Sequence, residues 1–455
     1  MKEYYDVIIV GAGPAGIFAA IELIKHAQDK LSILMVEKGG DLEERKRKKD
    51  FLSGWGGAGA FSDGKITLSP DIGGWLTSLL SWSEVEKLIN YVDNIWAELS
   101  PEAGYYPFDE DAVAELASRA RKNHLKLVPY RIRHLGSDYT PKALNKARNI
   151  IEKYAEVKLH CAAKNILADN GKVQGVILDD GSRVFSKYVI VAPGRYGASW
   201  LVNEMRRLNV PLKVNPVDIG VRVETNYEVM EDITEILYEP KLLYYSPTYD
   251  DVVRTFCVNP RGYVIKEKYE DVITTNGHAY ETKKSDNTNF ALLISSNFTE
   301  PFKDPISYGK HIARLANLLS GGSVIVQRLG DLKRGRRSTH ERLAKSIVEP
   351  TLKDSIPGDI SYVLPHRHLV GILEALKAMD SLSSGLFSDH TLIYVAEVKF
   401  YSSRVDITPD METKKIKNLF TIGDGAGISR GLAQASATGI LAARAILSRE
   451  MNIRF

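Results

Sequence analysis

A glycine-rich turn close to the first residue restricts the fold of this chain more than any other feature. Residues 11–16 read Gly-Ala-Gly-Pro-Ala-Gly, which matches the pattern G-x-G-x-x-G. A short apolar run over 6–10 precedes the turn, and a helical pattern over 14–27 follows it. A second apolar run, 31–36, ends at Glu37, roughly twenty positions after the last glycine, which is the usual spacing. This order predicts a dinucleotide-binding unit.

The residues of this unit have distinct physical roles. Gly11 permits the tight turn, Gly13 lets the backbone approach a diphosphate, and Gly16 lets the helix pack against the strand. The N-terminus of the helix presents N–H groups and a partial positive charge to phosphates. Glu37 can accept hydrogen bonds from both hydroxyls of a ribose and would repel a 2′-phosphate. We therefore expect an unphosphorylated adenosine.

A complementary pattern lies near the other end of the chain. Residues 419–422 form an apolar strand that ends at Gly423 and Asp424, and Gly431 opens a final helix. A carboxylate at a strand end can bind the sugar-chain hydroxyls of a dinucleotide. The N-terminus of the final helix can stabilise negative charge on a redox-active ring of such a dinucleotide when that ring is reduced. We interpret the two ends of the chain as the two halves of one site.

Length and composition limit the remaining possibilities. The chain has 455 residues, which predicts two domains, and its net charge of +3 is too small to indicate a nucleic-acid partner. Cys161 and Cys257 form neither a disulfide framework nor a metal-ligand pattern, so we predict no metal site and expect a cytoplasmic protein. Glycines, a proline and Glu22 interrupt the apolar segment 7–24, which argues against a signal peptide or a membrane span.

Local signals predict further elements. Ser83 with Glu86 predicts a capping box that opens a helix ending near Leu99. Thr140 and Pro141 predict the start of another helix, which ends near Tyr154. Short strands are predicted over 157–163, 173–178, 183–185 and 187–191, separated by Asn-Gly and Asp-Gly turns.

The two halves of the predicted site carry a family resemblance. Residues 11–16 and Glu37, taken with 421–424, resemble the FAD-binding domain of the glutathione-reductase-like flavoprotein superfamily. Residues 189–194 resemble the strand of that superfamily that ends in Ala-Thr-Gly, with Pro193 in place of the threonine. The resemblance implies that FAD is the cofactor and that the Gly-Asp pair contacts its ribityl and diphosphate region.

A second resemblance extends through nearly the whole chain, to the family of FAD-dependent, or NAD(FAD)-utilising, dehydrogenases. It rests on residues 56–65, 134–138, 256–257 with Pro260, and 424–427. It implies that the glycine-rich loop from Trp55 to Lys65 covers the diphosphate and flanks the isoalloxazine, with Asp63 and Lys65 as candidates near the ring. Asn259 stands where family members often carry a second cysteine, so no dithiol is expected.

We predict an α/β protein in which a Rossmann-like FAD-binding domain of the three-layer ββα type carries an inserted mixed α+β domain. The FAD-binding domain comprises 1–212 and 394–455, and residues 213–393 form a substrate or cap domain. Ala163 is expected to border the adenine, and Arg45 is either an adenosine contact or part of a solvated helix face. The predicted cofactor contacts are Gly11, Gly13, Pro14, Ala15, Gly16, Glu37, Lys38, Arg45, Gly56, Gly57, Ala58, Gly59, Ser62, Ala163, Ala192, Gly194, Gly423, Asp424, Gly431, Leu432 and Ala433.

The resemblance implies an FAD-dependent oxidoreductase that transfers a hydride between FAD and an unidentified small-molecule substrate. NADH or NADPH is a candidate transient donor or acceptor, although mid-chain carries no second G-x-G-x-x-G motif of its own. No Cys-x-x-x-x-Cys follows the first unit, which argues against a disulfide reductase. The sequence identifies no catalytic acid or base.

Two alternatives stay open. A flavin-dependent RNA-modifying or nucleic-acid-associated protein is supported only by the four basic residues within 333–337. These residues could also bind an anionic substrate, and an exposed loop is the favoured interpretation. A non-catalytic FAD-binding regulator is the other. His366 and His368 have no third ligand beside them, and Cys257 is more typical of a buried thiol than of a redox centre.

Overall fold

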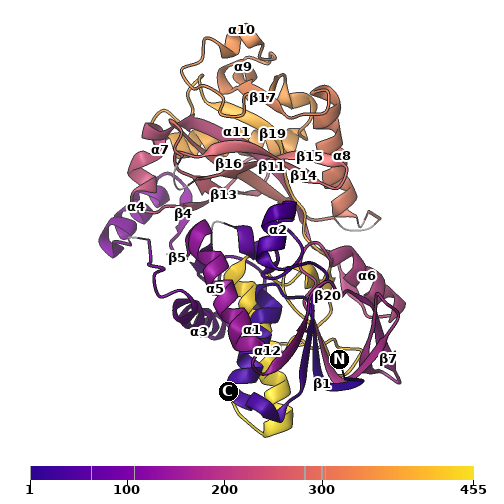
Figure 1. Cartoon of the computed structure of the whole chain (residues 1–455). Helices are drawn as coiled ribbons and strands as arrows, with labels where there is room; N and C mark the ends of the chain where they lie inside the picture. Colours follow the sequence, from indigo (N-terminus) through magenta and orange to yellow (C-terminus); the bar gives the residue numbers. More distant parts are fainter. Residues whose placement is uncertain (1, 63, 107, 281–282, 299–300, 303) are drawn as a thin grey trace. The chain divides into compact units, whose positions relative to one another are not determined.

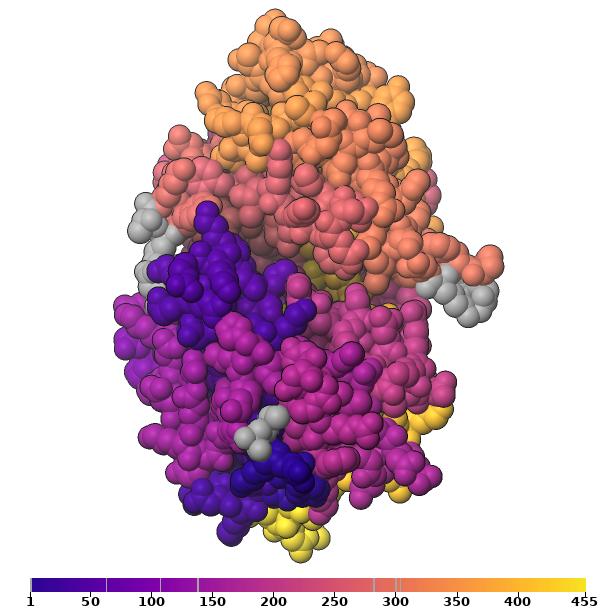
Figure 2. Space-filling model, turned by 45° about the vertical axis from the view of Figure 1, so that its right-hand side comes forward, coloured from indigo at the N-terminus to yellow at the C-terminus, as the bar shows by residue number. Residues whose placement is uncertain are grey.

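The computed structural model describes residues 2–62, 64–106, 108–280, 283–298, 301–302 and 304–455. The chain forms two compact units (Figure 1). The first unit is built from three separate segments, 1–106, 130–215 and 402–455. The second unit is built from 107–129 and 216–401. In Figure 2 the surface of the first unit accordingly mixes indigo, magenta and yellow. The colours of 216–401 in the second unit lie next to one another on the bar, because this segment is continuous in sequence.

A largely parallel sheet forms the centre of the first unit. Its strand order is β6-β2-β1-β9-β8-β7, and β21 pairs with β9 off this path. The apolar β1 (Tyr4–Val10) lies between β2 (Ile33–Val36) and β9 (Arg183–Val191) and runs parallel to both. Because side chains on both faces of these strands are buried, the strands read as continuous apolar runs. This sheet and its helices confirm the prediction of a Rossmann-like α/β fold with an additional domain.

Two helices from opposite ends of the chain pack together against this sheet. Helix α1 (Pro14–Ala27) is buried along most of its length and contacts α12 (Leu432–Met451). A Cβ on Gly439 would lie 2.1 Å from the Ala15 carbonyl oxygen, so the two helices approach more closely than a side chain would allow. The buried Glu22 of α1 accepts hydrogen bonds from Arg444 and Tyr91, both at 2.7 Å, and ties α12 and α3 to it.

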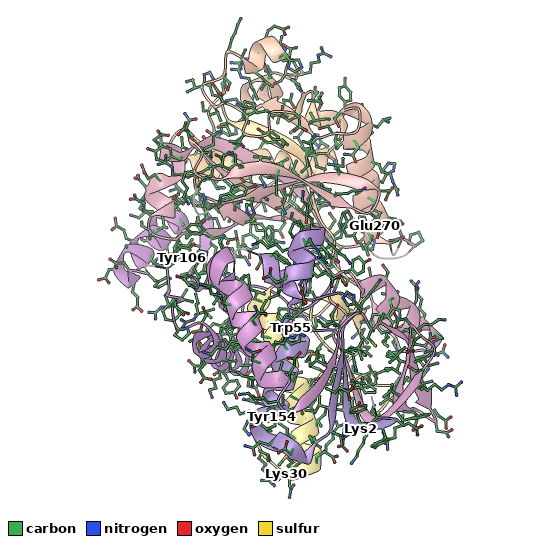
Figure 3. All side chains as sticks on the ribbon, viewed as in Figure 1. Lys2, Lys30, Trp55, Tyr106, Tyr154 and Glu270 are labelled. Atoms are coloured by element: carbon green, nitrogen blue, oxygen red, sulfur yellow. The ribbon has the colours of Figure 1, made fainter. Side chains whose placement is uncertain are left out.

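The other strands of the first unit are β3 (Lys65–Leu68), β5 (Arg131–His134), β6 (Ala155–Lys158), β7 (Ala163–Asp169), β8 (Lys172–Leu178), β10 (Leu212–Lys213), β20 (Arg404–Val405) and β21 (Leu419–Thr421). Its other helices are η1 (Gln28–Lys30), α2 (Leu42–Lys48), η2 (Gly57–Phe61), η3 (Leu76–Ser78), α3 (Trp82–Leu99), α5 (Gly136–Ile151), α6 (Ala198–Arg207) and η5 (Asp424–Ala426). Figure 3 shows Trp55 inside this unit and Lys2 and Lys30 at its surface.

The second unit is organised around an eight-stranded sheet. Its strand order is β18-β17-β19-β11-β16-β13-β12-β4. Along β11 (Val217–Asn226), Val217, Ile219, Val221 and Val223 pack into an apolar core. The alternate positions carry Asp218, Arg222 and Glu224, which are also buried. One face of this sheet is therefore apolar and the other holds a buried polar network.

The other strands of the second unit are β4 (Leu125–Val128), β12 (Lys241–Tyr245), β13 (Val252–Asn259), β14 (Tyr263–Tyr269), β15 (Val272–His278), β16 (Asn287–Ser296), β17 (Ile325–Arg328), β18 (Ile356–Pro357) and β19 (Leu392–Lys399). Its helices are α4 (Glu110–Lys122), α7 (Tyr227–Thr234), α8 (Pro305–Leu319), α9 (Leu329–Lys333), α10 (His340–Leu343), η4 (Ile360–Tyr362) and α11 (His366–Asp380).

The unit boundaries differ from the predicted domain limits. The predicted boundary between 393 and 394 would cut β19, an interior strand of the second sheet, and the second unit instead ends at Tyr401. The segment 107–129, predicted within the first domain, belongs to the second unit because β4 pairs with β12. The other boundary falls at 215/216 rather than 212/213.

Two predicted helix starts were wrong. The capping box is formed by Ser81 and Glu84, two residues before the predicted pair, and opens α3. Helix α5 begins at Gly136, so that Pro141 lies inside it, and the Thr140 hydroxyl donates to the Gly136 carbonyl at 2.7 Å instead of capping a helix.

The predicted strands at 183–185 and 187–191 form one strand, β9, and the predicted strand 157–163 is divided between the ends of β6 and β7.

No helix among the described residues combines the length and the apolar character needed to cross a bilayer. No group of three or more His, Cys, Asp or Glu side chains among them is arranged to hold a metal ion.

Candidate dinucleotide-binding site

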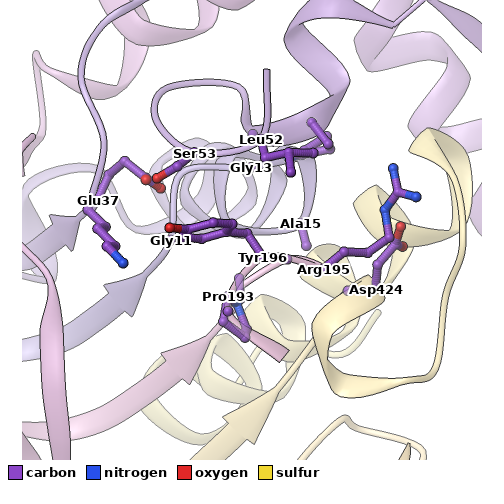
Figure 4. A pocket seen from close by; sticks show the side chains of 18 of the residues that line it. Gly11, Gly13, Ala15, Glu37, Leu52, Ser53, Pro193, Arg195, Tyr196 and Asp424 are labelled. Carbon is purple, nitrogen blue, oxygen red and sulfur yellow. The ribbon is translucent and has the colours of Figure 1, made fainter. Parts of the chain in front are cut away.

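A cavity of about 360 Å³ opens in the first unit at the carboxyl ends of β1, β2, β9 and β21. In open α/β sheets this edge is where ligands bind. Figure 4 shows Glu37 and Ser53 toward one end of the cavity and Arg195 and Asp424 toward the other. Glu37 and Asp424, which lie close to opposite ends of the sequence, thus line one cavity.

The glycine turn lines this cavity, and close contacts require two of its three glycines. Gly11 has a φ of +102°, and a Cβ there would lie 2.2 Å from the Ala192 carbonyl oxygen. A Cβ on Gly16 would lie 2.0 Å from the Gly11 carbonyl oxygen, so any larger residue would push α1 away from the turn. The nearest atom to a Cβ on Gly13 is 3.8 Å away. Gly13 therefore keeps the turn open toward the cavity rather than packing against protein.

Glu37 holds the turn in place. Its Oε2 accepts a hydrogen bond from the Ala12 N–H at 2.8 Å, and its Oε1 accepts from the N–H groups of Gly39 and Gly54, each at 2.9 Å. The residue is 8% exposed. One carboxylate therefore joins the glycine turn to the loop that follows α2. Since a carboxylate offers about four lone-pair positions, the three contacts leave capacity for a ligand hydroxyl.

The glycine-rich loop is held against the turn by a buried arginine. Arg45 is 1% exposed and donates to the carbonyl oxygens of Trp55 and Gly57, the latter at 2.8 Å. Burial lowers the pKa of the Arg45 guanidinium. A Cβ on Gly59 would lie 2.7 Å from Leu432 Cδ2 and 3.1 Å from Pro14 Cγ. The loop therefore lies between the N-termini of α1 and α12.

The C-terminal segment contributes Asp424 and the start of α12. Asp424 accepts a hydrogen bond from the Ser429 hydroxyl at 2.8 Å and one from the Gly431 backbone N–H. Burial raises the pKa of Asp424, while the charge of Arg195 acts in the opposite direction. Gly431, with a φ of +128°, is the N-cap of α12 and leaves the first turn of the helix without a side-chain cap. Its first N–H groups are thereby left for a ligand.

The segment before α3 is anchored to the same helix by Gln434. Its buried side-chain amide donates to the carbonyl oxygens of Pro70 and Ile72, at 3.2 and 2.9 Å. Its oxygen accepts from the Leu76 N–H at 3.4 Å. This brace fixes residues 70–76 beside the N-terminus of α12.

The turn that follows β9 supplies residues that the sequence analysis missed. Arg195 and Tyr196 line the cavity, together with Pro193 and Gly197. The Lys38 ammonium lies 4.8 Å from the centre of the Tyr196 ring. Glycines at both ends of this short segment, directly after a strand of the central sheet, were the signal that could have identified it.

Most predicted contacts do line the cavity. The residues brought together there are Gly11, Gly13, Pro14, Ala15, Glu37, Lys38, Gly57, Ala58, Gly59, Ser62, Ala163, Ala192, Gly194, Gly423, Asp424, Gly431 and Leu432. The predicted residues Gly16, Arg45, Gly56 and Ala433 are not among them. The missed lining residues are Val10, Val36, Leu52, Ser53, Cys161, Ala162, Pro193, Arg195, Tyr196, Gly197, Trp200 and Ala435.

The four predicted residues outside the lining have supporting positions. Gly16 and Arg45 act through packing and through the loop, as described above. The Gly56 N–H donates to the Ala12 carbonyl at 2.8 Å, and Ala433 is buried within α12. Of the two roles considered for Arg45, the solvated helix face is wrong, because the side chain is 1% exposed and donates to loop carbonyls. The direct adenosine contact finds no support, because Arg45 does not line the cavity. Asp63 lies outside the described residues, and Lys65 is in β3, paired with His134 of β5.

The second unit contains the other signals that the sequence raised. In the basic cluster, Lys333 and Arg334 both form ion pairs with Asp389 at 2.7 Å, and Arg336 pairs with Asp331 at 2.9 Å. Hydrogen bonds from Lys333 and Arg334 lower the pKa of Asp389 to about 2. Two carboxylates therefore neutralise half of the positive charge that suggested an RNA partner.

Cys257 lies beside a buried ion pair. Arg222 and Glu397, both fully buried, are joined at 2.7 Å, and Lys399 lies 2.9 Å from the same carboxylate. Arg222 also donates to the Cys257 carbonyl oxygen at 2.9 Å. The Cys257 thiol is partly buried and accepts a contact from the Asn259 amide at 3.5 Å. Asn259 thus packs against the thiol at the position where a second cysteine would stand.

The residues of the cavity fit an extended dinucleotide on structural grounds. The glycine turn leaves space at Gly13 that a side chain would fill, and the first residues of α1 and α12 line the same cavity. Carboxylates stand at both ends, where a dinucleotide has sugar hydroxyls. The lining contains two cations, Lys38 after β2 and Arg195 after β9, and this placement suits a diphosphate between them.

Two family models and one relative match parts or most of this chain. Residues 216–399 match the family model described as "FAD-dependent protein, C-terminal domain-like", and residues 376–453 match the model described as "Glucose inhibited division protein A". An uncharacterised protein of Clostridium beijerinckii is 24% identical over 474 aligned residues, which cover 97% of this chain and 80% of that protein.

Solved structures with a similar arrangement include L-proline dehydrogenase from P. horikoshii (12% identity, TM-score 0.41, covering 99% of this chain and 95% of that chain). Glycine oxidase from Geobacillus kaustophilus is another (12% identity, TM-score 0.40, covering 100% and 97%). Scores of this size do not carry a function from one chain to another. The two family matches confirm the prediction of an FAD-dependent oxidoreductase, and neither of them names a substrate.

Proposed function

We propose that the cavity binds FAD in an extended conformation and that the protein transfers a hydride between this FAD and a small-molecule substrate. One observation carries the proposal: Glu37 and Asp424, from opposite ends of the chain, line a single cavity at the carboxyl edge of the parallel sheet. In this arrangement Glu37 holds the adenosine ribose, and Asp424 holds the hydroxyls of the ribityl chain. The N-terminus of α1 holds the diphosphate.

Bound FAD supplies the redox chemistry, accepting or donating a hydride at its ring. The chain's own contribution is positioning and electrostatics. The first turn of α12, which has no side-chain cap, would present its N–H groups to the ring and would favour negative charge there. The loop between 54 and 62, held by Arg45, limits the access of water to the diphosphate. The unit of 216–401 with 107–129 is the proposed substrate domain.

The resemblance to the glutathione-reductase-like superfamily and to FAD-dependent dehydrogenases supports this proposal. The RNA-modifying alternative receives no support, because three of the four basic side chains of its cluster are already paired with Asp331 or Asp389. NADH and NADPH stay candidate donors, and they would bind without a second glycine motif in the chain.

The test is to purify the protein, record its flavin spectrum, and add NADH, NADPH and candidate donors in the absence of oxygen. Bleaching of the flavin band by one donor identifies the electron source and excludes a non-catalytic regulator. The variant Gly13→Glu places a negative side chain where the diphosphate should lie, so it should lose flavin. A colourless wild-type protein that also fails to bind added FAD contradicts the proposal.

A further inference from the structure

A β-bulge in the second unit turns Cys257 away from the apolar core. The pairing of β13 with β16 shifts register between Phe256 and Asn259, so that two residues of β13 stand opposite one residue of β16. Cys257 has a φ of +48°, which is uncommon for a residue with a side chain. The next residue, Val258, packs into the apolar core. The bulge therefore leaves the Cys257 side chain on the polar side of the sheet.

The Cys257 thiol has polar neighbours there. Its sulfur lies 3.5 Å from Asn259 Nδ2, which donates toward it, and 3.9 Å from the carbonyl oxygen of Gly277 on β15. Strand β15 packs against β11, β13, β16 and β19 and so covers part of the polar face (Figure 1). The thiol is nevertheless only partly buried, and a small reagent can reach it.

Buried positive charge is in excess beside this thiol. Arg222 and Lys399 both bind the Glu397 carboxylate, at 2.7 and 2.9 Å, and all three side chains are at most 8% exposed. The other partner of Lys399 is Glu267, at 3.4 Å, whose carboxylate is 40% exposed and therefore screened by water. The charge of Arg222 also acts on Cys257. A negative charge at the sulfur would balance the second cation.

One buried amide in this group of side chains lacks an acceptor. Asn289 is fully buried, and its Oδ1 accepts from Arg222 at 3.1 Å and from Asn259 at 3.4 Å. These two donors fix the orientation of the amide, because a flipped amide would set donor against donor. Its Nδ2 has no acceptor within the described residues. Since an unpaired buried donor is costly, an acceptor atom placed among these side chains would be stabilised.

We propose that Cys257 is a site of reversible oxidation by hydroperoxides, and that Asn259 and Asn289 donate hydrogen bonds to the oxygen that is added to its sulfur. In this step the sulfur attacks one peroxide oxygen, the S–O bond forms as the O–O bond breaks, and the sulfur loses two electrons. With hydrogen peroxide, the other oxygen leaves with the thiol proton as water. The product is a sulfenic acid, which adds one acceptor atom and, when ionised, the negative charge that the buried cations favour.

The sulfenic acid has no second thiol with which to react in its own unit. A sulfenic acid condenses with a neighbouring thiol to form a disulfide. The chain has two cysteines, and the other, Cys161, belongs to the first unit. The oxidised sulfur should therefore last long enough to be trapped. The inference goes beyond the proposed function and uses none of its flavin chemistry.

The experiment exposes the full-length protein to hydrogen peroxide in the presence of dimedone, which labels sulfenic acids, and measures the label at each cysteine by peptide mass spectrometry. Cys161 is the internal control, because it is also partly buried and burial raises the pKa of its thiol. Since Cys161 lines the dinucleotide cavity, labelling is measured with and without added FAD. Cys257 should take up label at least about tenfold faster than Cys161. Dithiothreitol added before dimedone should restore the free thiol.

Two isosteric variants test the hydrogen bonds to the added oxygen. Asn289→Asp and Asn259→Asp each replace amide donors by acceptor oxygens and add a negative charge, so each should slow the labelling of Cys257 by about tenfold or more. Asn297→Asp adds the same charge at an exposed position of the same unit and should label like the wild type. Thermal unfolding identifies the variants that keep the fold. The wild-type ratio of Cys257 to Cys161 needs no variant and stays a test if neither aspartate variant folds.

Equal labelling of the two cysteines in the wild type would overturn the proposal, and so would folded aspartate variants that label like the wild type. Because the assay uses no flavin, selective labelling of Cys257 in a protein that fails to bind FAD would refute the proposed function and leave this site standing. A protein that binds FAD but takes up no label at Cys257 would do the reverse.

Discussion

Replacing Glu37 with glutamine should destabilise the first unit even when no nucleotide is present. The carboxylate accepts three backbone N–H groups, from Ala12, Gly39 and Gly54. Glutamine keeps one oxygen, which can continue to accept from Gly39 and Gly54. Its amide group would then face the Ala12 N–H, so that two donors oppose each other in a buried position. Leaving one buried donor unsatisfied costs roughly 1–3 kcal/mol, and a loss of about 2 kcal/mol in the free energy of unfolding is expected.

Tryptophan fluorescence gives an assay that is specific to this unit. All five tryptophans, Trp55, Trp75, Trp82, Trp96 and Trp200, lie in the first unit. Urea denaturation of nucleotide-free protein, followed at these residues, should show a lower midpoint for Glu37→Gln than for the wild type. Glu43→Gln, which removes the same charge from an exposed site on α2, is the control and should leave the midpoint unchanged. If Glu37→Gln unfolds like the wild type without ligand, then Glu37 is not a brace of the turn and the reasoning fails.

Three further outcomes are expected. Gly11→Ala should lower the free energy of unfolding in urea far more than Gly194→Ala. Both residues have positive φ, but a Cβ on Gly11 would lie 2.2 Å from a carbonyl oxygen, whereas nothing lies within 4 Å of one on Gly194. Gly194→Ala should cost only the roughly 1–2 kcal/mol of the left-handed conformation, and similar losses of stability in the two variants would contradict this reasoning. Arg45→Met should raise hydrogen exchange of the loop 51–62, since it removes the donors to the Trp55 and Gly57 carbonyls, and unchanged exchange would rule out the brace. Burial lowers the pKa of His368 to about 4 from an ordinary value of 6.5, so its contribution to the stability of the folded state is complete above pH 6.5 and is lost as the pH falls toward 4. Calorimetry should therefore show a decline over that range that is smaller in His368→Asn, and equal slopes would show that another group titrates.

The parts of the site that could be predicted are those where backbone geometry allows few residue types. Gly11 and Gly16 are predictable because a Cβ at either would overlap a carbonyl oxygen. Glu37 is predictable from its spacing, although the sequence suggests only a ligand contact and gives no sign of its three backbone hydrogen bonds. The partners of Arg45 could not be predicted, since its burial depends on the path of a loop that has no regular periodicity. Tyr196 was missed because its turn carries no pattern beyond two glycines.

The fold shows the same division. The parallel strands could be predicted from continuous apolar runs, and α1 from the glycine turn that opens it. Helix starts were less certain, because Ser81 and Ser83 are both followed three residues later by glutamate, so the sequence offers two capping boxes and packing selects one. The membership of β4 in the second unit could not be predicted, because it depends on pairing with β12, more than a hundred residues later in the chain.

The three-segment construction of the first unit has a consequence for synthesis. Strand β21 and helix α12 belong to the last of these segments, 402–455. Helix α1, which packs on α12, belongs to the first segment, 1–106. While the ribosome adds the intervening residues, α1 lacks the helix that covers it, and its apolar surface is open to misassociation. A cavity bounded by Asp424 and Leu432 cannot close until both residues have left the ribosome. A nucleotide should therefore be retained only after that point, and a chain cut short before β21 should remain dependent on chaperones.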